Sequence, residues 1–361
     1  MFGQAVRTVT DAEVQRVHKS ALLIDSHNDV TSETVKGLDI GPARSSGHTD
    51  LPRLRAGGVG AVFFAAYVSG TYDKKGRSAH RALEMIDTIR HDIVAGHPRD
   101  FELALTAADV ERAHGRGKIA ALIGIEGGHA IQDDVRLLRD FYALGVRYMT
   151  LTHANHNGWA DSSGSAGAPH NGLSDLGRSV VAEMNRLGMM VDISHVSDKT
   201  FWDALAVSKA PLFASHSSCR AISNIKRNMT DEMIRALAKK GGVIQVNFGC
   251  EFLSQQSADT SSWSNPKLKG KKVHPKRATL ADVVAQIRHA ISIAGVQAVG
   301  IGSDFDGVEC TPVGLDDVAK FPALTRALLE SGLSGEDVRA IYGGNLLRVM
   351  RAVEAAAEPV Q

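Results

Sequence analysis

Cysteine is scarce in this sequence. Cys219, Cys250 and Cys310 are the only three, an odd number, and no two of them form a CxxC pair. The pattern predicts neither a disulfide framework nor a thiolate zinc site. A reduced, cytoplasmic setting is therefore the default expectation, and a periplasmic or secreted location is the alternative for a chain from which an export signal has been removed.

Long apolar runs and an excess of charge are also missing. The longest apolar runs, such as residues 59–68, are too short to span a bilayer. Residues 1–19 have no signal-peptide core, and the C-terminal letters EAAAEPVQ offer no apolar tail for an anchor. We therefore expect no membrane anchor. The formal net charge is +1, which gives no argument for a nucleic-acid partner or an anionic membrane surface, so no nucleic-acid partner is expected either.

The sequence does contain a long alternation of two patterns. Eight short apolar, β-branched runs recur, most of them continuous, which is typical of strands buried on both faces. They cover residues 21–24, 59–68, 119–125, 145–151, 189–194, 210–215, 241–248 and 298–303. Helical periodicity separates most of them. This pattern predicts an α/β protein with a (β/α)8 TIM barrel of the metal-dependent hydrolase type, one catalytic domain over residues 1–361 with a loop insertion at about 254–277.

Helix boundary signals support the same fold. Segment 176–188 ends in Gly188, segment 230–241 begins at a capping Thr230, and segment 279–295 opens with an approximate capping box. Segment 78–96 also has helical periodicity, and 334–358 reads as a terminal helix that Gly343-Gly344 weakens or breaks. The alternative is an open doubly wound sheet, but its G-x-G-x-x-G loop is absent after the first strand.

Six of the eight predicted strands end in residues that ligate metals. Turn residues or satisfied core histidines are the simpler explanation for any one of them. In a (β/α)8 barrel, however, the C-terminal strand ends surround one active site, so these side chains are expected to converge. They are His27, Asp29, Glu126, His153, His195, His216, Asp304 and Asp306.

Imidazoles and carboxylates without thiolate suit zinc, with manganese, cobalt or iron as substitutes. Five of these residues are too many for one tetrahedral ion with an open position, and they fit two Zn²⁺ ions bridged by Glu126. His27 and Asp29 would complete one ion's ligands, and His195 and His216 the other's. Such a pair would polarise a carbonyl and supply a bridging hydroxide near neutral pH, so the expected reaction is hydrolysis.

The sequence resembles the membrane (renal) dipeptidase family, peptidase family M19, among the amidohydrolase-like barrels. The resemblance covers most of the chain and is carried by the motifs IDSHND, GIEGGHAI, LTHANHNGWADSS, VDISHVS, FASHSSCRAI, KRNMTDE and IGSDFDGV. It implies a binuclear zinc metallohydrolase that cleaves dipeptides, with a homodimeric assembly. Its metal ligands map onto His27, Asp29, Glu126, His195 and His216.

The resemblance also implies three further roles. His153 would hydrogen-bond the oxygen of the tetrahedral intermediate, and Arg227 would pair with the C-terminal carboxylate of the dipeptide. Asp304 would carry the proton from the attacking water to the leaving amine. A C-terminal D-residue could be accepted. The alternatives are a dizinc amidohydrolase acting on N-acyl amino acids or another small amide or lactone, and a non-catalytic protein that keeps its metals for stability.

Two smaller expectations concern the surroundings of this site. Asp25 shares the parity of His27 but lies deeper, so it is expected to orient a ligand rather than to be one. Segment 254–277 is either a flexible surface loop or a lid over the dipeptide site.

Overall fold

The centre of the computed structural model, which describes residues 7–358, is a parallel β-sheet that curls into a barrel. Its strands follow one another in sequence order, which confirms the predicted α/β barrel. Across the last seam the Asp304 N–H donates to the His27 carbonyl (3.0 Å), and the Asp29 N–H donates to the Phe305 carbonyl (2.9 Å). The barrel strands are β1 (Leu23–Asn28), β2 (Val59–Tyr67), β4 (Ile119–Glu126), β5 (Val146–Thr150), β6 (Met190–Asp192), β7 (Phe213–Ser217), β8 (Val243–Val246) and β9 (Val299–Ile301).

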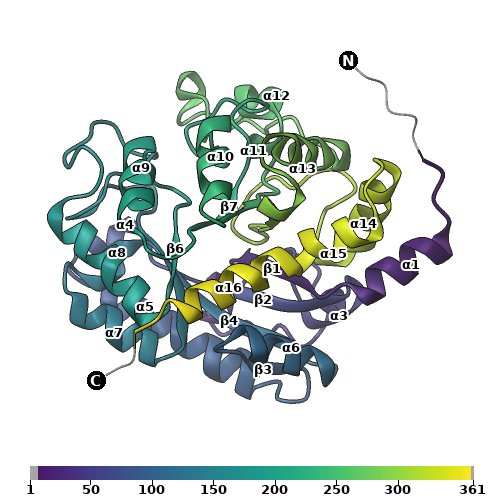
Figure 1. The fold of residues 1–361 in the computed structure, drawn as a ribbon, viewed down its shortest axis with the longest axis horizontal. Helices are drawn as coiled ribbons and strands as arrows, with labels where there is room; N and C mark the ends of the chain where they lie inside the picture. Colours follow the sequence, from purple (N-terminus) through teal and green to yellow (C-terminus); the bar gives the residue numbers. More distant parts are fainter. Residues whose placement is uncertain (1–6, 359–361) are drawn as a thin grey trace.

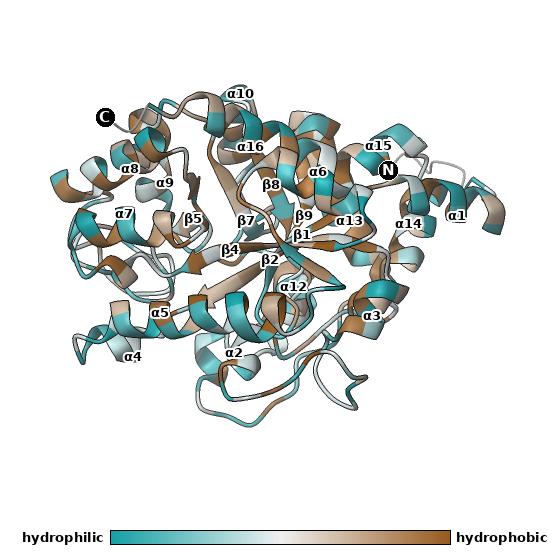
Figure 2. Cartoon of the chain, turned by 90° about the horizontal axis from the view of Figure 1, so that it is seen from below, coloured by the Kyte–Doolittle hydropathy of each residue, from teal (hydrophilic) through white to brown (hydrophobic). Residues whose placement is uncertain are grey.

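Helices connect the strands and cover the outside of the barrel (Figure 1). Figure 2 colours the central strands largely brown and gives the outer helices one brown and one teal side, as expected when a helix buries a single face. The longer helices are α1 (Asp11–Ser20), α5 (Ser78–Thr88), α6 (Ala107–Gly115), α7 (Val135–Ala143), α8 (Asp175–Leu187), α9 (Asp198–Val207), α10 (Asp231–Lys239), α13 (Leu280–Ala294), α14 (Phe321–Glu330) and α16 (Asn345–Ala355). Shorter ones are α2 (Thr31–Thr34), α3 (Leu51–Ala56), α4 (Gly70–Asp73) and α15 (Gly335–Arg339).

The predicted helix signals are present in the structure. The Thr230 side chain accepts from the Met233 N–H (3.2 Å) at the start of α10, and Asp282 accepts from the Thr279 N–H (2.7 Å) at the start of α13. Gly188 follows α8 with a left-handed φ of 78°. A π-helical turn over Ala340–Gly344 separates α15 from α16, at the predicted weak point.

The first strand differs from its prediction. It was expected over residues 21–24 with a polar end beyond it, but β1 continues through Asn28. Polar side chains can belong to this strand because their partners lie inside the barrel; the Ser26 hydroxyl, for example, donates to the Ser215 carbonyl (2.6 Å). A ninth strand, β3 (Phe101–Leu103), pairs with β4 beside the barrel path. Strand β3 was not predicted, because three residues are too few to show a strand-like hydrophobic pattern.

Two cysteines are paired, contrary to the prediction. Cys250, which begins α11 (Cys250–Leu253), forms a disulfide with Cys310 in the loop after β9. The two cysteines are 60 residues apart in the sequence, but the loops after β8 and β9 meet at the mouth of the barrel and bring them together. The odd total arises from one free buried thiol, Cys219. The argument from reduced cysteines for a cytoplasmic location therefore no longer applies, because disulfides persist mainly in oxidising compartments.

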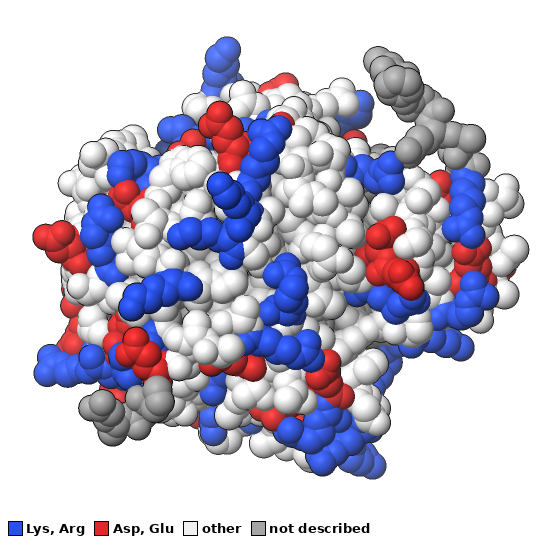
Figure 3. Space-filling model, in the orientation of Figure 1, with Lys and Arg blue, Asp and Glu red and all other residues white. Residues whose placement is uncertain are grey.

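Segment 254–277 contains helix α12 (Gln255–Thr260), a 3₁₀ turn at Pro266–Leu268 and otherwise irregular chain. Within residues 7–358, none of the helices combines the length and apolarity needed to cross a bilayer. Residues 1–6 and 359–361, on which part of the expectation of no leader and no anchor falls, lie outside the described residues. On the face seen in Figure 3, basic and acidic side chains intermingle, in keeping with the near-zero net charge.

One glycine in the barrel interior permits a close approach that bears on stability. Gly124 in β4 faces the ring of Tyr148, which would overlap any added Cβ. Tyr148 is fully buried and packs against Phe63 and Phe213, with ring centroids 5.0 and 5.2 Å away. Gly124→Ala is expected to cost about 1–3 kcal/mol of unfolding free energy in urea denaturation, because the core cannot absorb the methyl group. Gly115→Ala, where a Cβ meets nothing within 4 Å, is the matched control. Equal stability of the two variants would contradict this packing.

Candidate metal centre

The predicted site residues meet at the C-terminal mouth of the barrel, around a cavity of about 570 Å³. Its floor is formed by strand ends, and its wall includes the loop after β9 and segment 254–277. The lining residues are Asp29, Ser32, Tyr67, Glu126, His153, His195, Arg227, Glu251, Phe252, Ser262, Trp263, Asp304, Asp306, Gly307, Val308 and Glu309. Segment 254–277 thus contributes to the cavity wall through Ser262 and Trp263.

One half of the site is built by β1 and the end of β4. His27 Nε2 lies 3.2 Å from Asp29 Oδ2 and 3.7 Å from Glu126 Oε2. His27 Nε2 and Asp29 Oδ2 are buried, yet neither has a hydrogen-bond partner of acceptable geometry. Buried polar atoms without partners are costly, and a cation shared by these two atoms would satisfy both.

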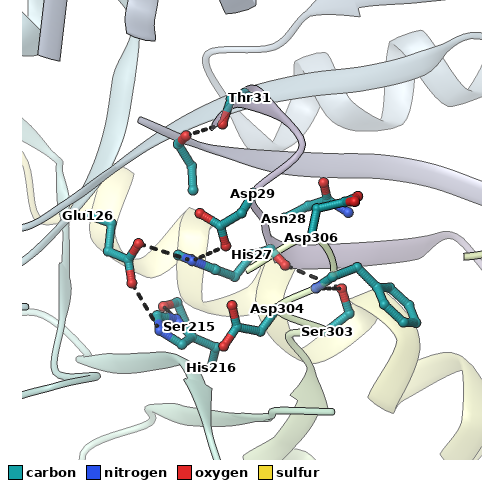
Figure 4. A network of polar contacts seen from close by, with 12 residues as sticks. His27, Asn28, Asp29, Thr31, Glu126, Ser215, His216, Ser303, Asp304 and Asp306 are labelled. Atoms are coloured by element: carbon teal, nitrogen blue, oxygen red, sulfur yellow. Dashed lines mark hydrogen bonds and ion pairs between the residues drawn. The ribbon is translucent and has the colours of Figure 1, made fainter. Parts of the chain in front are cut away.

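The other half faces the second oxygen of the same glutamate. Glu126 Oε1 lies 2.9 Å from His195 Nε2 and 3.3 Å from His216 Nε2. The two imidazole nitrogens are themselves 2.9 Å apart. Figure 4 shows Glu126 reaching His27 with one oxygen and His216 with the other. One carboxylate therefore stands between two sets of donors.

The charges of these groups suit metal binding. Burial alone would raise the pKa of Glu126, but the charges of His27 and His153 and hydrogen bonds from His195 and His216 hold that pKa well below its usual range. Burial lowers the pKa of His195 and of His216 well below the ordinary value, with a further contribution from nearby positive charge. An ionised Glu126 and neutral His195 and His216 are the protonation states that bind divalent cations. His27 differs: although burial acts to lower its pKa, Tyr148 and the carboxylates of Asp29 and Glu126 raise it well above the ordinary value, so a bound cation would displace its proton.

Buried groups behind the histidines fix their orientation. The Tyr148 hydroxyl lies 2.8 Å from His27 Nδ1, and Ser215 Oγ lies 2.6 Å from His216 Nδ1. Ser215 in turn donates to Asp192 (2.6 Å). These contacts leave each Nε2 directed at Glu126, which is how partners behind a metal ligand normally act. Asp25 accepts from the Ser303 N–H (2.8 Å), so it joins the ends of β1 and β9.

Asp304 occupies the side of the site next to Asp29. Its Oδ2 accepts from Asn247 Nδ2 (2.7 Å), and Asn247 Oδ1 accepts from the Gly249 N–H (2.6 Å). A Cβ on Gly307 would collide with both Asp304 Oδ1 and Asp29 Oδ2, so these two carboxylates face one another across that glycine. Burial and the neighbouring charge of Asp29 raise the pKa of Asp304 well above its usual range. Bound positive charge would lower it again.

His153 and Arg227 also line the cavity. His153 Nε2 lies 3.7 Å from Glu126 Oε1, and burial lowers its pKa, so the ring is neutral at pH 7. The Arg227 guanidinium donates to Ser217 Oγ (3.3 Å) and to the His216 carbonyl (3.1 Å). Burial lowers the pKa of Arg227 to about 10, which leaves it charged at pH 7.

Three site residues have left-handed backbone conformations without being glycine. The φ angles are 68° at His195, 60° at Asp304 and 65° at Asp306. Such conformations cost about 1–3 kcal/mol each and persist where the surrounding structure imposes them. Asp306 uses its conformation to accept from the His48 N–H (2.8 Å), so it anchors the loop before α3.

Comparison with known proteins identifies this arrangement. A family model described as membrane dipeptidase (peptidase family M19) matches residues 11–361. This chain belongs to that family. The dipeptidase verJ of Clonostachys rogersoniana is 40% identical over 348 residues, which cover 92% of this chain and 84% of the relative.

Two solved structures are similar over nearly the full length. A metallo peptidase from Rhodobacter sphaeroides, liganded with a phosphinate mimic of the dipeptide L-Ala-D-Ala, is 28% identical, with a TM-score of 0.80 over 92% of this chain and 99% of that one. The probable dipeptidase PvdM from Pseudomonas aeruginosa shares the fold, with a TM-score of 0.87 at 24% identity, over 96% of this chain and 98% of that one.

Membership of peptidase family M19 makes this chain a metal-dependent dipeptidase with an amidohydrolase-type barrel. All eight residues predicted at strand ends lie around the mouth, although Asp306 faces the His48 loop. Sequence reasoning missed Tyr148 and Asn247, which orient His27 and Asp304. Both lie within predicted strands, and a polar residue inside an otherwise apolar run was the sequence signal that could have identified them.

Proposed function

We propose that this M19 dipeptidase holds two Zn²⁺ ions at the barrel mouth, with Glu126 as the bridging ligand. His27 and Asp29 would bind one ion, and His195 and His216 the other. The observation that carries the proposal is the position of Glu126, with one oxygen 2.9 Å from His195 Nε2 and the other 3.7 Å from His27 Nε2. The donor set of imidazole and carboxylate, without thiolate, suits zinc.

When bound, the two ions would polarise the scissile carbonyl and make a water molecule acidic enough to attack near neutral pH. The chain's own residues supply the remaining chemistry. Arg227 binds the C-terminal carboxylate of the dipeptide, which places the peptide bond over the ligands. His153 donates an N–H to the carbonyl oxygen as negative charge develops there.

Asp304 is the proton carrier in this proposal. It takes the proton from the attacking water and delivers it to the nitrogen of the leaving amino acid. Its position beside Asp29 places it at the edge of the ligand set, and Asn247 holds one of its oxygens. The other oxygen, Oδ1, lies beside Gly307 and Asp29 and would exchange the proton. Binding of the terminal carboxylate at Arg227 would restrict cleavage to the C-terminal peptide bond.

The proposal predicts that metal controls activity. Dialysis against a chelator is expected to abolish hydrolysis of Gly-Gly and Ala-Ala, and two equivalents of Zn²⁺ per chain to restore it, as measured by ninhydrin assay and metal analysis. N-acetylalanine, which keeps the carboxylate but lacks the free amine, serves as the comparison substrate. Faster turnover of N-acetylalanine than of either dipeptide would favour the N-acyl amino acid alternative, and restoration by a single equivalent would contradict the two-ion site.

Two further points belong to this proposal. The Cys250–Cys310 disulfide favours an oxidising compartment, periplasmic or extracellular, over the cytoplasm. Homodimerisation, which the family resemblance implies, remains a prediction that light scattering of the purified protein can test.

A further inference from the structure

An aromatic pair from the α11–α12 region forms part of the cavity wall outside the metal ligands. The ring of Trp263 stacks on that of Phe252, with centroids 5.4 Å apart and an interplanar angle of 28°. Phe252 in turn lies under the guanidinium of Arg227, whose Cζ is 5.1 Å from the ring centroid. Arginine, phenylalanine and tryptophan are therefore stacked in three layers, from the floor of the cavity to its rim.

Trp263 is unusual because it is large, apolar and 58% exposed. Exposed apolar surface at the edge of a cavity is commonly a place for ligand contact. The large exposed apolar residues of the described chain are Leu83, Trp202, Trp263 and Val313, and of these Trp263 alone lines the cavity. The exposed ring of Trp263 is therefore available to a ligand in the cavity.

The chain fixes this aromatic pair in place. The disulfide between Cys250 and Cys310 lies two residues before Phe252, and the Cys250 N–H also donates to the Cys310 carbonyl (2.9 Å). Further along, the Ser261 hydroxyl donates to Glu251 (2.7 Å) and accepts from the Trp263 N–H (3.2 Å). The pair is thus held as a preformed surface, which reduces the ordering cost of binding.

Arg227 determines what would meet that surface. Two of its nitrogens are already bonded to Ser217 and His216, and Phe252 covers one face of the guanidinium. Its Nε is buried without a hydrogen-bond partner. A ligand carboxylate would use the remaining N–H groups at the edge of the guanidinium, within a short distance of the Phe252 ring.

In a dipeptide the carboxylate and the C-terminal side chain are attached to the same Cα atom. Binding of the carboxylate at Arg227 consequently places that side chain within reach of Phe252 and Trp263. We infer that these two rings form the binding surface for the C-terminal side chain, and that the enzyme prefers dipeptides with a large apolar or aromatic C-terminal residue. The inference rests on the proposed role of Arg227.

Charge in the same wall supports this preference. Glu251 and Glu309 also line the cavity. An acidic C-terminal side chain beside them would experience like-charge repulsion in a partly buried setting. Gly-Phe and Gly-Leu should therefore be better substrates than Gly-Gly, and Gly-Glu should be worse than Gly-Leu.

The test compares kcat/KM for Gly-Phe and Gly-Gly in the zinc-loaded enzyme, in Trp263→Ala and in Trp202→Ala. The wild-type enzyme is expected to prefer Gly-Phe, and Trp263→Ala to reduce that preference by about three- to tenfold, mainly through KM, because one aromatic contact is lost. The fall in kcat/KM should be smaller for Gly-Gly than for Gly-Phe, because glycine has no side chain to contact the missing ring. Trp202 in α9 is also an exposed tryptophan but does not line the cavity, so its replacement should alter neither substrate.

The outcomes separate the inference from the proposed function. Equal loss on both substrates in Trp263→Ala, or no wild-type preference for Gly-Phe, would overturn the inference while Gly-Gly turnover keeps the dipeptidase proposal intact. Failure of the wild-type enzyme to hydrolyse either dipeptide with zinc supplied would overturn the proposed site, and the inference with it. Phe252→Leu is a second variant for the same comparison. It removes the ring but keeps apolar bulk, so it should also lower the preference for Gly-Phe over Gly-Gly.

Discussion

Replacing Glu126 by glutamine is expected to abolish dipeptide hydrolysis almost completely and to release at least one metal ion per chain. The two side chains have nearly the same shape, so the barrel should remain folded. The amide, however, has one oxygen where the carboxylate has two, and its NH₂ group would point at a cation. The glutamine could therefore not bind both the ion at His27 and the ion at His195 and His216. Loss of several kcal/mol of transition-state stabilisation corresponds to at least about a 10³-fold fall in kcat.

Metal analysis and kinetics on the same preparation would check this result. Glu183→Gln is the matched control, because Glu183 lies on the outer helix α8 and pairs with Arg139 (2.5 Å) and Arg186 (2.8 Å) far from the cavity. It should keep both its metal and its activity. If Glu126→Gln retained two ions and normal turnover, the bridging role would be wrong.

Replacing Asp304 by asparagine is expected to lower kcat by about 10²- to 10⁴-fold, the usual contribution of a positioned acid–base group. The new amide oxygen can still accept from Asn247 Nδ2, so the side chain should keep its place. It cannot take up a proton. Metal content and KM should change little, because the five proposed ligands and Arg227 are untouched.

Steady-state kinetics with metal analysis distinguishes this role from ligation. His27, Asp29 and Asp304 lie close enough together to share one ion, so a loss of metal in Asp304→Asn would make Asp304 a ligand rather than a proton carrier. Asp306→Asn is the control. Asp306 lies two residues after Asp304, but its side chain accepts from the His48 N–H. An equal fall in kcat in both variants would point to a general loosening of the loop after β9.

The fold and most of the site follow from a local signal and one topological rule. Glu126, His195 and His216 each follow an apolar run, and a parallel barrel brings all C-terminal strand ends to one mouth. That rule needs no knowledge of side-chain contacts. It brought His27 and Asp29 to the same mouth as well, even though β1 extends further than its apolar letters indicated.

The remaining features depend on contacts between distant segments. The Cys250–Cys310 disulfide joins two loops that are adjacent only in the folded barrel, and the pairing of Tyr148 with His27 spans 121 residues. Neither leaves a periodic pattern. The stack of Arg227, Phe252 and Trp263 also joins separate segments, and of the three only Trp263 lies in segment 254–277, whose sequence left surface loop and lid as alternatives.

The left-handed backbone at His195, Asp304 and Asp306 places conformational strain in residues around the mouth of the barrel. Glycine would relax the backbone at any of the three, yet two of them carry proposed site chemistry that glycine cannot supply. Glycine would also remove the hydrogen bonds that these side chains make, which offsets the relief of strain. Changes that raise the melting temperature without loss of turnover are therefore expected on the outer helices.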